Sequence, residues 1–451
     1  MVTDTDSPPS TEPLTVVTLV KYLLGSRQAI LTVDSNPASI WVGFLFVLSA
    51  GFAREYDRED LLREPWHLLL PFAASLVTSG LLFLMVSRLA MIRSAGLRAL
   101  HVEYRSFLGA YWMTAPLAWI YAIPVERLLS PENAVKANLY LLAIVSVWRV
   151  ALIIRVIVVT YHAKVIGAMS VVMLFASSVT LVLLGIMPRQ VSLMGLMAGL
   201  RLSESEHFIL DATLKVQVLA AMLLPLWIMT TIFAFLARTP PWRREKPQPG
   251  AETRAGWSIW LLCAVSVAGW SAVLPATQRE QALRRQVEDA IRDHRFEDAV
   301  NIMASHPRSE FPPHWVPLQH SDYLTRFKVM AALLDPLANR HDVWARPQLL
   351  DEFQRPLQVY FIGVSVLSEL TDEEKIKVLE TLRRLPERNE IIKGNVDGQR
   401  FGRTGFRNIL EVLAGEDATV YEGSRSPHAD KVRDLASTLL REFREWQKNS
   451  N

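Results

Sequence analysis

Residues 137–160 read ANLYLLAIVSVWRVALIIRVIVVT, and the only charged side chains in this stretch are Arg149 and Arg155. Apolar residues follow one another without alternation, which does not match a strand of a membrane barrel. A bilayer core is about 30 Å thick, and a helix needs roughly 20 mostly apolar residues to cross it. The stretch therefore predicts a membrane-spanning helix.

Six further stretches of the same character occupy most of the chain before residue 276. The seven predicted spans are 37–53, 66–87, 106–125, 137–160, 164–187, 212–237 and 256–275. Half of the 451 residues are apolar and 21% are charged, which excludes a disordered chain or a coiled coil. The predicted fold class is all-α: a polytopic helical transmembrane bundle of about seven spans within 37–275, followed by a mainly α-helical soluble domain. Almost nothing separates the fourth span from the fifth, so one of them failing to cross would reduce the count to six.

The segment that precedes the first span divides into two parts. Residues 1–14 are polar and acidic, and we expect a disordered N-terminal tail rather than a cleaved signal peptide. Residues 15–33 combine apolar positions such as Leu19 and Leu23 with the basic Lys21. This pattern is typical of an amphipathic interfacial helix in the headgroup region, and it equally fits a helix packed on the bundle.

Positive charge is concentrated in the membrane half of the chain. Residues 1–276 contain 22 Lys and Arg against 17 Asp and Glu, whereas the remaining residues contain 26 against 28. The C-terminal half therefore lacks the basic excess that nucleic-acid binding requires, and we expect no nucleic-acid partner. Cytoplasmic loops are enriched in Lys and Arg, and the distribution over the two sides, twelve against eight, favours a cytoplasmic N-terminus in an inner or plasma membrane. The side of the C-terminal domain then follows from the number of spans.

Residues 277–451 are predicted to form one helical soluble domain, long enough to bury its own core. A helical hairpin is expected around residues 290–299. Thr371, followed by three acidic residues, is expected to open a helix that ends near Leu385, because acidic groups stabilise the first turn of a helix. The final helix presents its apolar residues at helical spacing, namely Val432, Leu435, Leu439, Phe443 and Trp446.

Arg149 is the principal candidate site residue. A cation near the middle of a span is costly, and such residues face the protein interior or water. Arg149 is therefore a candidate contact for an anion or a lipid headgroup, with Arg155, which reaches toward the surface, as a second contact. In the alternative interpretation Arg149 is structural and bonds carbonyl groups of neighbouring helices.

Metal and cofactor chemistry has little support in the sequence. His306, His314 and His320 lie close together, but they lack the His-Glu-x-x-His spacing of a helical zinc site. Cys263 is the only cysteine, so an intramolecular disulfide or a cysteine-based metal site is excluded. The glycine-rich loop 394–405 lacks the Gly-Lys-Ser/Thr ending of a phosphate-binding loop. We expect no cofactor and no metal.

Two functions of different classes fit these observations. The favoured one is a non-enzymatic integral membrane protein whose bundle, embedded in the lipid bilayer, anchors a helical domain that docks a protein partner through the final helix or the hairpin. The second is a transporter, channel or lipid-handling protein that uses Arg149. Proton-coupled transport is disfavoured because residues 137–203 contain no Asp or Glu. An enzyme would require distant residues such as His67, Glu126 and His207 to converge, and no catalytic motif indicates one.

Overall fold

The computed structural model describes residues 13–53, 61, 65–89, 96–186, 204–236, 242, 254–313, 315, 317, 323–340, 342–357, 366–393, 405–415 and 428–450. In these ranges the ordered elements are helices, together with one isolated parallel bridge between Leu14 and Ala255. The all-α prediction is confirmed for this part of the chain. The predicted tail, apart from its last two residues, and nearly all of the glycine-rich loop 394–405 lie outside the described residues.

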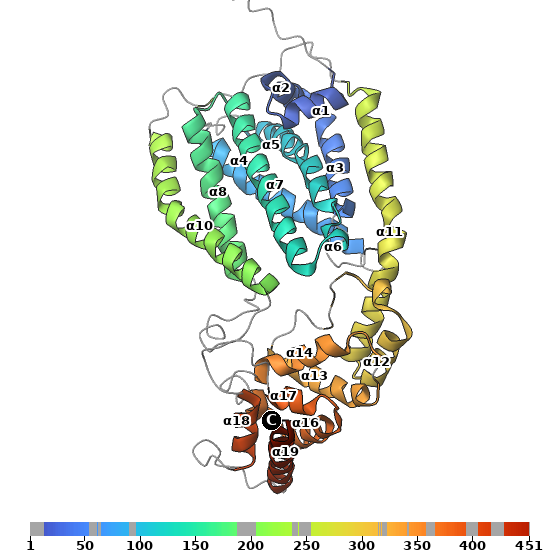
Figure 1. Ribbon diagram of the computed structural model, residues 1–451. Helices are drawn as coiled ribbons and strands as arrows, with labels where there is room; N and C mark the ends of the chain where they lie inside the picture. The colour runs from blue at the N-terminus through green and yellow to red at the C-terminus, as the bar shows by residue number, and fades with distance from the viewer. Residues whose placement is uncertain are drawn as a thin grey trace, which may run out of the picture. The chain divides into compact units, whose positions relative to one another are not determined.

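The chain divides into two compact units, and the boundary after Gln278 falls within helix α11 (Trp257–Arg292). The N-terminal unit is a helical bundle (Figure 1). Besides the first part of α11 it contains α1 (Val16–Leu23), α2 (Arg27–Ser35), α3 (Ser39–Ala53), η2 (Pro65–Leu68), α4 (Leu69–Leu89), α5 (Gly96–Trp112), η4 (Ala115–Ala122), α6 (Val125–Leu128), α7 (Pro131–Thr160), α8 (Val165–Ile186) and α10 (Glu204–Leu236). One buried apolar cluster joins α1, α2, α3, α5, α7 and α11, and a second joins α4, α5, α7 and α8.

Within the described ranges, five helices are long and apolar enough to cross a membrane. Their candidate spans are Pro65–Arg88, Glu132–Thr160, Val165–Leu183, Phe208–Leu236 and Trp257–Pro275. Each overlaps one of the predicted spans. Helices α2 and α3 add a sixth if the pair, bent by 102°, crosses as one broken span. The structure thus supports five or six of the seven predicted spans.

The predicted third span, 106–125, differs from the structure because it is not one helix. Helix α5 ends at Trp112, and the chain continues as the 3-10 helix η4. Pro116 lies at the start of η4, and a proline has no amide hydrogen to donate to the preceding turn of an α-helix. The apolar composition of 106–125 therefore does not produce a continuous span.

The predicted helix over 15–33 is likewise two helices, α1 and α2. Gly25 separates them with a φ of +78°, a left-handed conformation that glycine adopts without strain. The amide of Ser26 donates to the carbonyl oxygen of Lys21 at 3.0 Å, and the amide of Gly25 donates to that of Tyr22 at 2.8 Å. This pair of bonds is the Schellman motif that ends many helices.

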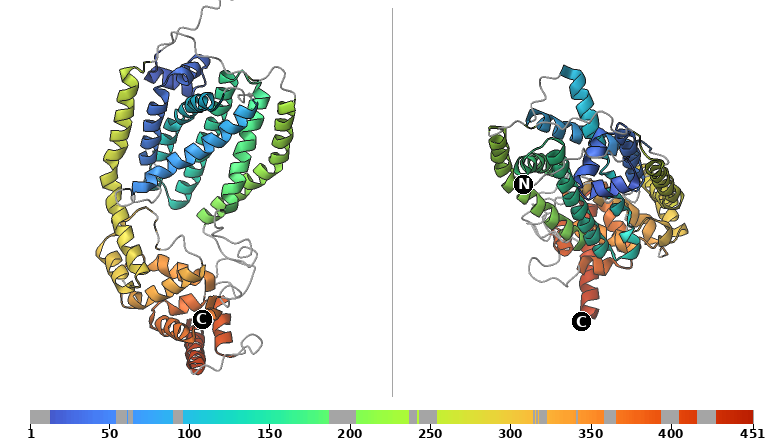
Figure 2. Two further views of the ribbon diagram at one scale, coloured as in Figure 1. Left: turned by 180° about the vertical axis from the view of Figure 1, so that it is seen from behind. Right: turned by 90° about the horizontal axis from the view of Figure 1, so that it is seen from above.

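Helices α1 and α2 lie at one end of the bundle, across the ends of the longer helices (Figure 1 and Figure 2). The start of α11 lies at the same end, because the amide of Gly256 donates to the carbonyl oxygen of Leu14 at 2.9 Å. The N-terminal segment and the beginning of the last candidate span are therefore joined directly.

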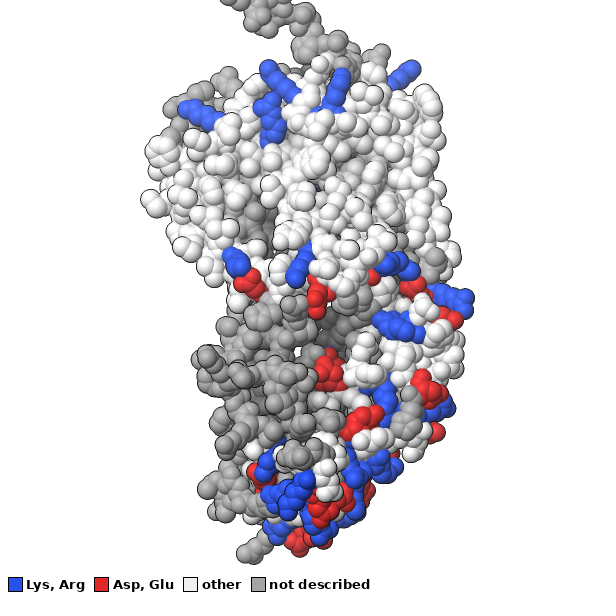
Figure 3. All heavy atoms as spheres, viewed as in Figure 1, with Lys and Arg blue, Asp and Glu red and all other residues white. Residues whose placement is uncertain are grey.

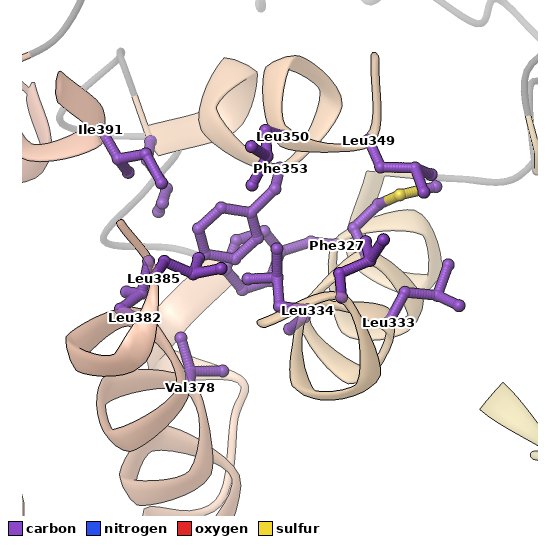
Figure 4. Close-up of a cluster of buried hydrophobic side chains, with 14 of the residues drawn as sticks. Phe327, Leu333, Leu334, Leu349, Leu350, Phe353, Val378, Leu382, Leu385 and Ile391 are labelled. Carbon is purple, nitrogen blue, oxygen red and sulfur yellow. The ribbon is translucent and has the colours of Figure 1, made fainter. Parts of the chain in front are cut away.

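The C-terminal unit contains the remaining helices around a core of its own. They are the last part of α11, α12 (Phe296–Ser305), η5 (Arg308–Glu310), α13 (Tyr323–Ala338), α14 (Arg346–Leu357), α16 (Asp372–Arg384), α17 (Arg388–Lys393), α18 (Gly405–Leu413) and α19 (Ala429–Ser450). In the core the rings of Phe327 and Phe353 stack at 5.1 Å between centroids (Figure 4). The predicted hairpin is confirmed as the α11–α12 turn. The predicted start at Thr371 is also confirmed, because Thr371 and Glu374 form a capping box at α16.

The two units differ in what they expose. Among the described residues, every exposed large hydrophobic side chain lies at or before Val265. In the C-terminal unit the exposed positions instead carry ion pairs such as Arg383–Glu442, with a nitrogen–oxygen distance of 2.8 Å. On the face drawn in Figure 3, the middle of the N-terminal unit carries no Lys, Arg, Asp or Glu among its described atoms. An uncharged band of this kind matches a hydrocarbon environment.

Candidate functional site

Arg149 lies on α7 and faces α5. The Cζ atom of its guanidinium lies 4.8 Å from the ring centroid of Tyr111, which is within the range of a cation–π interaction. The side chain is half-buried, and its Nε atom is fully buried without a hydrogen-bond partner among the described residues. A buried polar atom of this kind usually has a partner, and the Nε atoms of Arg284 and Arg326 in the C-terminal unit also lack one in the described part of the chain. What distinguishes Arg149 is its position within a candidate membrane span.

Tyr22 on α1 lies in the electrostatic field of Arg149. Its side chain is fully buried, and its hydroxyl group donates a hydrogen bond of 2.6 Å to the carbonyl oxygen of Ala110 on α5. Burial raises the pKa of Tyr22 above its usual value, Asp34 raises the pKa further and the positive charge of Arg149 lowers it. Because burial dominates, the phenol stays protonated at neutral pH and remains a hydrogen-bond donor to Ala110.

Arg155, the second predicted contact, lies on a different face of α7 from Arg149. It shares this face with Trp148, and both side chains bond the end of α1: Trp148 Nε1 donates to the carbonyl oxygen of Leu23 at 2.9 Å, and Arg155 Nε donates to that of Gly25 at 3.2 Å. The carbonyl groups at the end of a helix lack partners within the helix. Trp148 and Arg155 therefore fix the turn between α1 and α2 against α7.

The structure therefore does not bring Arg149 and Arg155 together into one site. Arg155 contacts a backbone carbonyl, as expected of a structural arginine, and it is exposed. Arg149 has the aromatic contact but shows no carbonyl bond among the described residues. The N–H groups of a guanidinium form a planar fork that matches a carboxylate or a phosphate. Arg149 is thus the better candidate for an anion within the bundle.

Tyr22 and Tyr111 were not identified by sequence reasoning, because they come from helices far from Arg149 along the chain. A tyrosine in an apolar helix has no local pattern that reveals its partner. In the sequence, the position of Arg149 within a predicted span is the only signal of this candidate site.

The other candidate residues do not come together in a site within the described part of the chain. No group of three or more His, Cys, Asp or Glu residues there is placed to hold a metal ion. His306 Nδ1 lies 3.0 Å from Glu310 Oε2, whereas His314 and His320 are outside the described residues. Glu126 accepts a hydrogen bond from Asn138.

The C-terminal unit has an aromatic cluster that sequence reasoning also missed. The rings of Phe311 and Trp315 stack at 5.5 Å, and the guanidinium of Arg308 lies 4.8 Å from the ring of Trp344. Burial lowers the pKa of Arg308, and Arg308 donates to the carbonyl oxygens of Pro312 and Trp315 at 2.7 and 3.3 Å. Because Arg308 itself covers the aromatic face, this cluster stabilises the connector after α12 rather than offering an open site.

No protein-family model matches the chain, and no curated protein or solved structure matches it. Its function therefore has to be inferred from the residues and their geometry.

Proposed function

We propose that this chain is a multi-pass integral protein of an inner or plasma membrane. The observation that carries this proposal is the segregation of exposed apolar side chains: those of the described residues all lie at or before Val265. Burying apolar surface stabilises a protein by about 25 cal/mol for each Å², so a bundle with this surface is stable in lipid and prone to aggregate in water. The C-terminal unit, from Arg279, has a buried core and a charged surface suited to water.

The bond between Gly256 and Leu14 bears on the side of the membrane that the C-terminal unit occupies. It supports a last span, Trp257–Pro275, that begins on the side of α1 and ends on the other. The bond supports this orientation whatever the number of spans in between. With the basic α1 end in the cytoplasm, we propose that the residues after Pro275 lie outside it.

In this architecture the bundle anchors the C-terminal unit, which docks a protein partner without performing catalysis. The proposed contact surfaces are the outer faces of α19 and of the α11–α12 hairpin. Arg441 on α19 and Glu297 on α12 are exposed, and the described surface of this unit has no exposed large hydrophobic side chain. We therefore expect a polar interface, in which charge complementarity governs specificity.

A photo-crosslinking amino acid at Arg441 or Glu297 of the full chain, in native membranes, tests the docking proposal. We expect one heterologous adduct of constant size from at least one of these positions, and none from Gln348, an exposed control position on α14. A reporter that is active only outside the cytoplasm, fused to the C-terminus, tests on which side of the membrane the C-terminal unit lies. Recovery of the chain only alone or crosslinked to itself would contradict docking.

A second candidate function is favoured by the unpartnered Nε atom of Arg149. Here the bundle binds or conducts an anion, or handles an anionic lipid, through Arg149 and Tyr111. In proteoliposomes that contain phosphatidylglycerol, Arg149→Ala should lower chloride flux or bound phosphatidylglycerol at least about tenfold, the effect of losing a charged hydrogen bond. Arg149→Lys should retain part of the function because it keeps the charge.

Lys136→Ala is the matched control for this prediction. Lys136 is also on α7, and its Nζ atom lies over an aromatic ring, 5.7 Å from the ring centroid of Phe208. If Lys136→Ala and Arg149→Ala change flux and lipid binding equally, or if neither changes them, Arg149 has no special role. Size-exclusion chromatography in detergent shows whether each variant still folds.

A further inference from the structure

Helix α1 exposes an apolar stripe that its own unit does not cover. Val17, Val20 and Leu24 are 61%, 51% and 71% exposed. With the exposed Lys21 they follow a spacing of three, one and three residues, which places all four on one face of a helix. The opposite face is buried, and it includes Tyr22. One side of α1 therefore packs on the bundle, while the other presents apolar side chains around one lysine.

Arg155 stands beside this stripe as a fixed cation. Its Nε atom bonds the carbonyl oxygen of Gly25, directly after α1. A Cβ atom on Gly25 would lie 3.4 Å from Arg155 Cγ, so the turn and the side chain are in close contact. The Nη atoms of Arg155 have no hydrogen-bond partner among the described residues. The guanidinium is thus oriented by one bond, and its terminal N–H fork faces outward.

The exposed charges drawn around this position are of one sign, whereas Asp34 on α2 is buried. On the face drawn in Figure 3, the end of the N-terminal unit where α1 and α2 lie shows Lys and Arg but no Asp or Glu among its described atoms. Lys21 and Arg27 belong to these two helices. Juxtamembrane basic residues attract anionic lipids, and an arginine fork binds a phosphate group through two parallel hydrogen bonds.

We propose that the exposed face of α1 and the guanidinium of Arg155 form an interfacial site for an anionic phospholipid. Val17, Val20 and Leu24 lie against the upper acyl chains, and Arg155, with Lys21, binds the headgroup phosphate. The apolar stripe is what selects a lipid over a soluble phosphate, because a free anion gains nothing from contact with three aliphatic side chains. This site rests on the proposed membrane location, and it is separate from Arg149, which faces Tyr111 inside the bundle.

Native mass spectrometry of the full chain, released from detergent with phosphatidylglycerol or with phosphatidylcholine added, tests the site. We expect Arg155→Gln to weaken phosphatidylglycerol binding about fivefold, the contribution of one basic residue at an anionic surface. Phosphatidylcholine binding should change little, and glycerol phosphate in solution should not compete. Arg127→Gln is the matched control: Arg127 is an exposed arginine on α6, which precedes the opposite end of α7.

The position of α1 in the membrane is measured independently. Cys263 is the only cysteine, so a Cys263→Ser chain with Val20→Cys carries one nitroxide label on the stripe. We expect its collisions with oxygen to exceed those of the same label placed at Arg292→Cys, which is exposed on the C-terminal unit. If Arg155→Gln does not fold, Arg155→Lys replaces it in the test. This variant keeps the positive charge but loses the guanidinium fork, so it should weaken phosphatidylglycerol binding by a smaller factor.

Equal phosphatidylglycerol binding by the Arg155→Gln and unmodified chains, or an equal loss with Arg127→Gln, would overturn the site while leaving the membrane proposal intact. A label at Val20 that is as accessible to water as the one at residue 292 would overturn it as well. A chain that stays soluble and folded without detergent or lipid would instead defeat the membrane proposal itself.

Discussion

Replacing Arg346 by alanine should make the amides of α14 and α17 exchange with deuterium about tenfold faster or more. The Arg346 side chain is 6% exposed, and its Nε and Nη2 atoms donate to the two carboxylate oxygens of Glu387 at 2.9 and 2.8 Å. Its Nη1 atom donates to the carbonyl oxygens of Leu337 and Arg340, near the end of α13. The Glu387 side chain is 36% exposed, so water can replace part of what Arg346 supplies to it. Leaving the carbonyl groups that Arg346 bonds without a donor costs about 1–3 kcal/mol, which corresponds to about tenfold or more in the opening equilibrium.

The size of this effect comes from the groups that Arg346 leaves behind. In Arg346→Ala the carbonyl groups of Leu337 and Arg340 lose the donor that compensates their desolvation, and Glu387, which is 36% exposed, loses its bidentate contact with Arg346. Arg346→Met combined with Glu387→Leu removes both charges and should lose less stability than Arg346→Ala alone. Hydrogen exchange measured on the full chain in detergent gives the exchange rates of α14 and α17 separately from those of the bundle.

Arg433→Ala is the control for this prediction. Arg433 lies on α19 and pairs with Asp430 at 3.5 Å, and the two side chains are 57% and 91% exposed. Surface pairs of this kind contribute little, so exchange in α19 should change by less than about threefold. A comparable acceleration in both variants would show that the Arg346–Glu387 pair is not a special link between α13, α14 and α17.

The candidate membrane spans were predictable because length and apolar composition are local properties. Five of the predicted spans overlap helices that can cross a bilayer, and Pro225 within α10 did not interrupt that helix. The segment 106–125 shows the limit of this reasoning. Its composition is that of a span, but whether Pro116 bends a helix or ends it depends on packing around η4. The break at Gly25, in contrast, had a local signal, since glycine is the usual residue after a helix.

The candidate site was predictable only in part. The cost of a charge within a span singles out Arg149 from the sequence, yet its partner Tyr111 comes from another helix and its neighbour Tyr22 from the N-terminal segment. The pair Arg346–Glu387 is similar, because neither residue lies in a local pattern that indicates the other. Contacts between distant segments are set by helix packing. No short stretch of the sequence indicates which helices pack together.

The stability of the bundle should be most sensitive at Gly43, where α3 approaches α5. A Cβ atom at Gly43 would lie 2.7 Å from the Cβ atom of Trp112 and 3.3 Å from its carbonyl carbon. Trp112 cannot withdraw easily, because its Nε1 atom donates to Ser75 Oγ at 2.9 Å within a buried cluster. Close approach of helices through small residues is common in membrane bundles, and overpacking such a contact costs about 1–3 kcal/mol.

Gly43→Ala should therefore lose its monodisperse chromatographic peak in detergent at a temperature at least about 2 °C below that of Gly269→Ala, because both variants gain the helix preference of alanine and only Gly43→Ala is overpacked. Gly43→Val should lower the temperature further. Gly269→Ala is the matched control, because Gly269 lies inside α11 and a Cβ atom there would meet nothing within 4 Å. Since alanine favours helix over glycine by about 1 kcal/mol, this control should leave the temperature unchanged or raise it. If Gly43→Ala behaves like Gly269→Ala, the α3–α5 contact is looser than the distance to Trp112 implies, and the bundle does not depend on a small residue at this position.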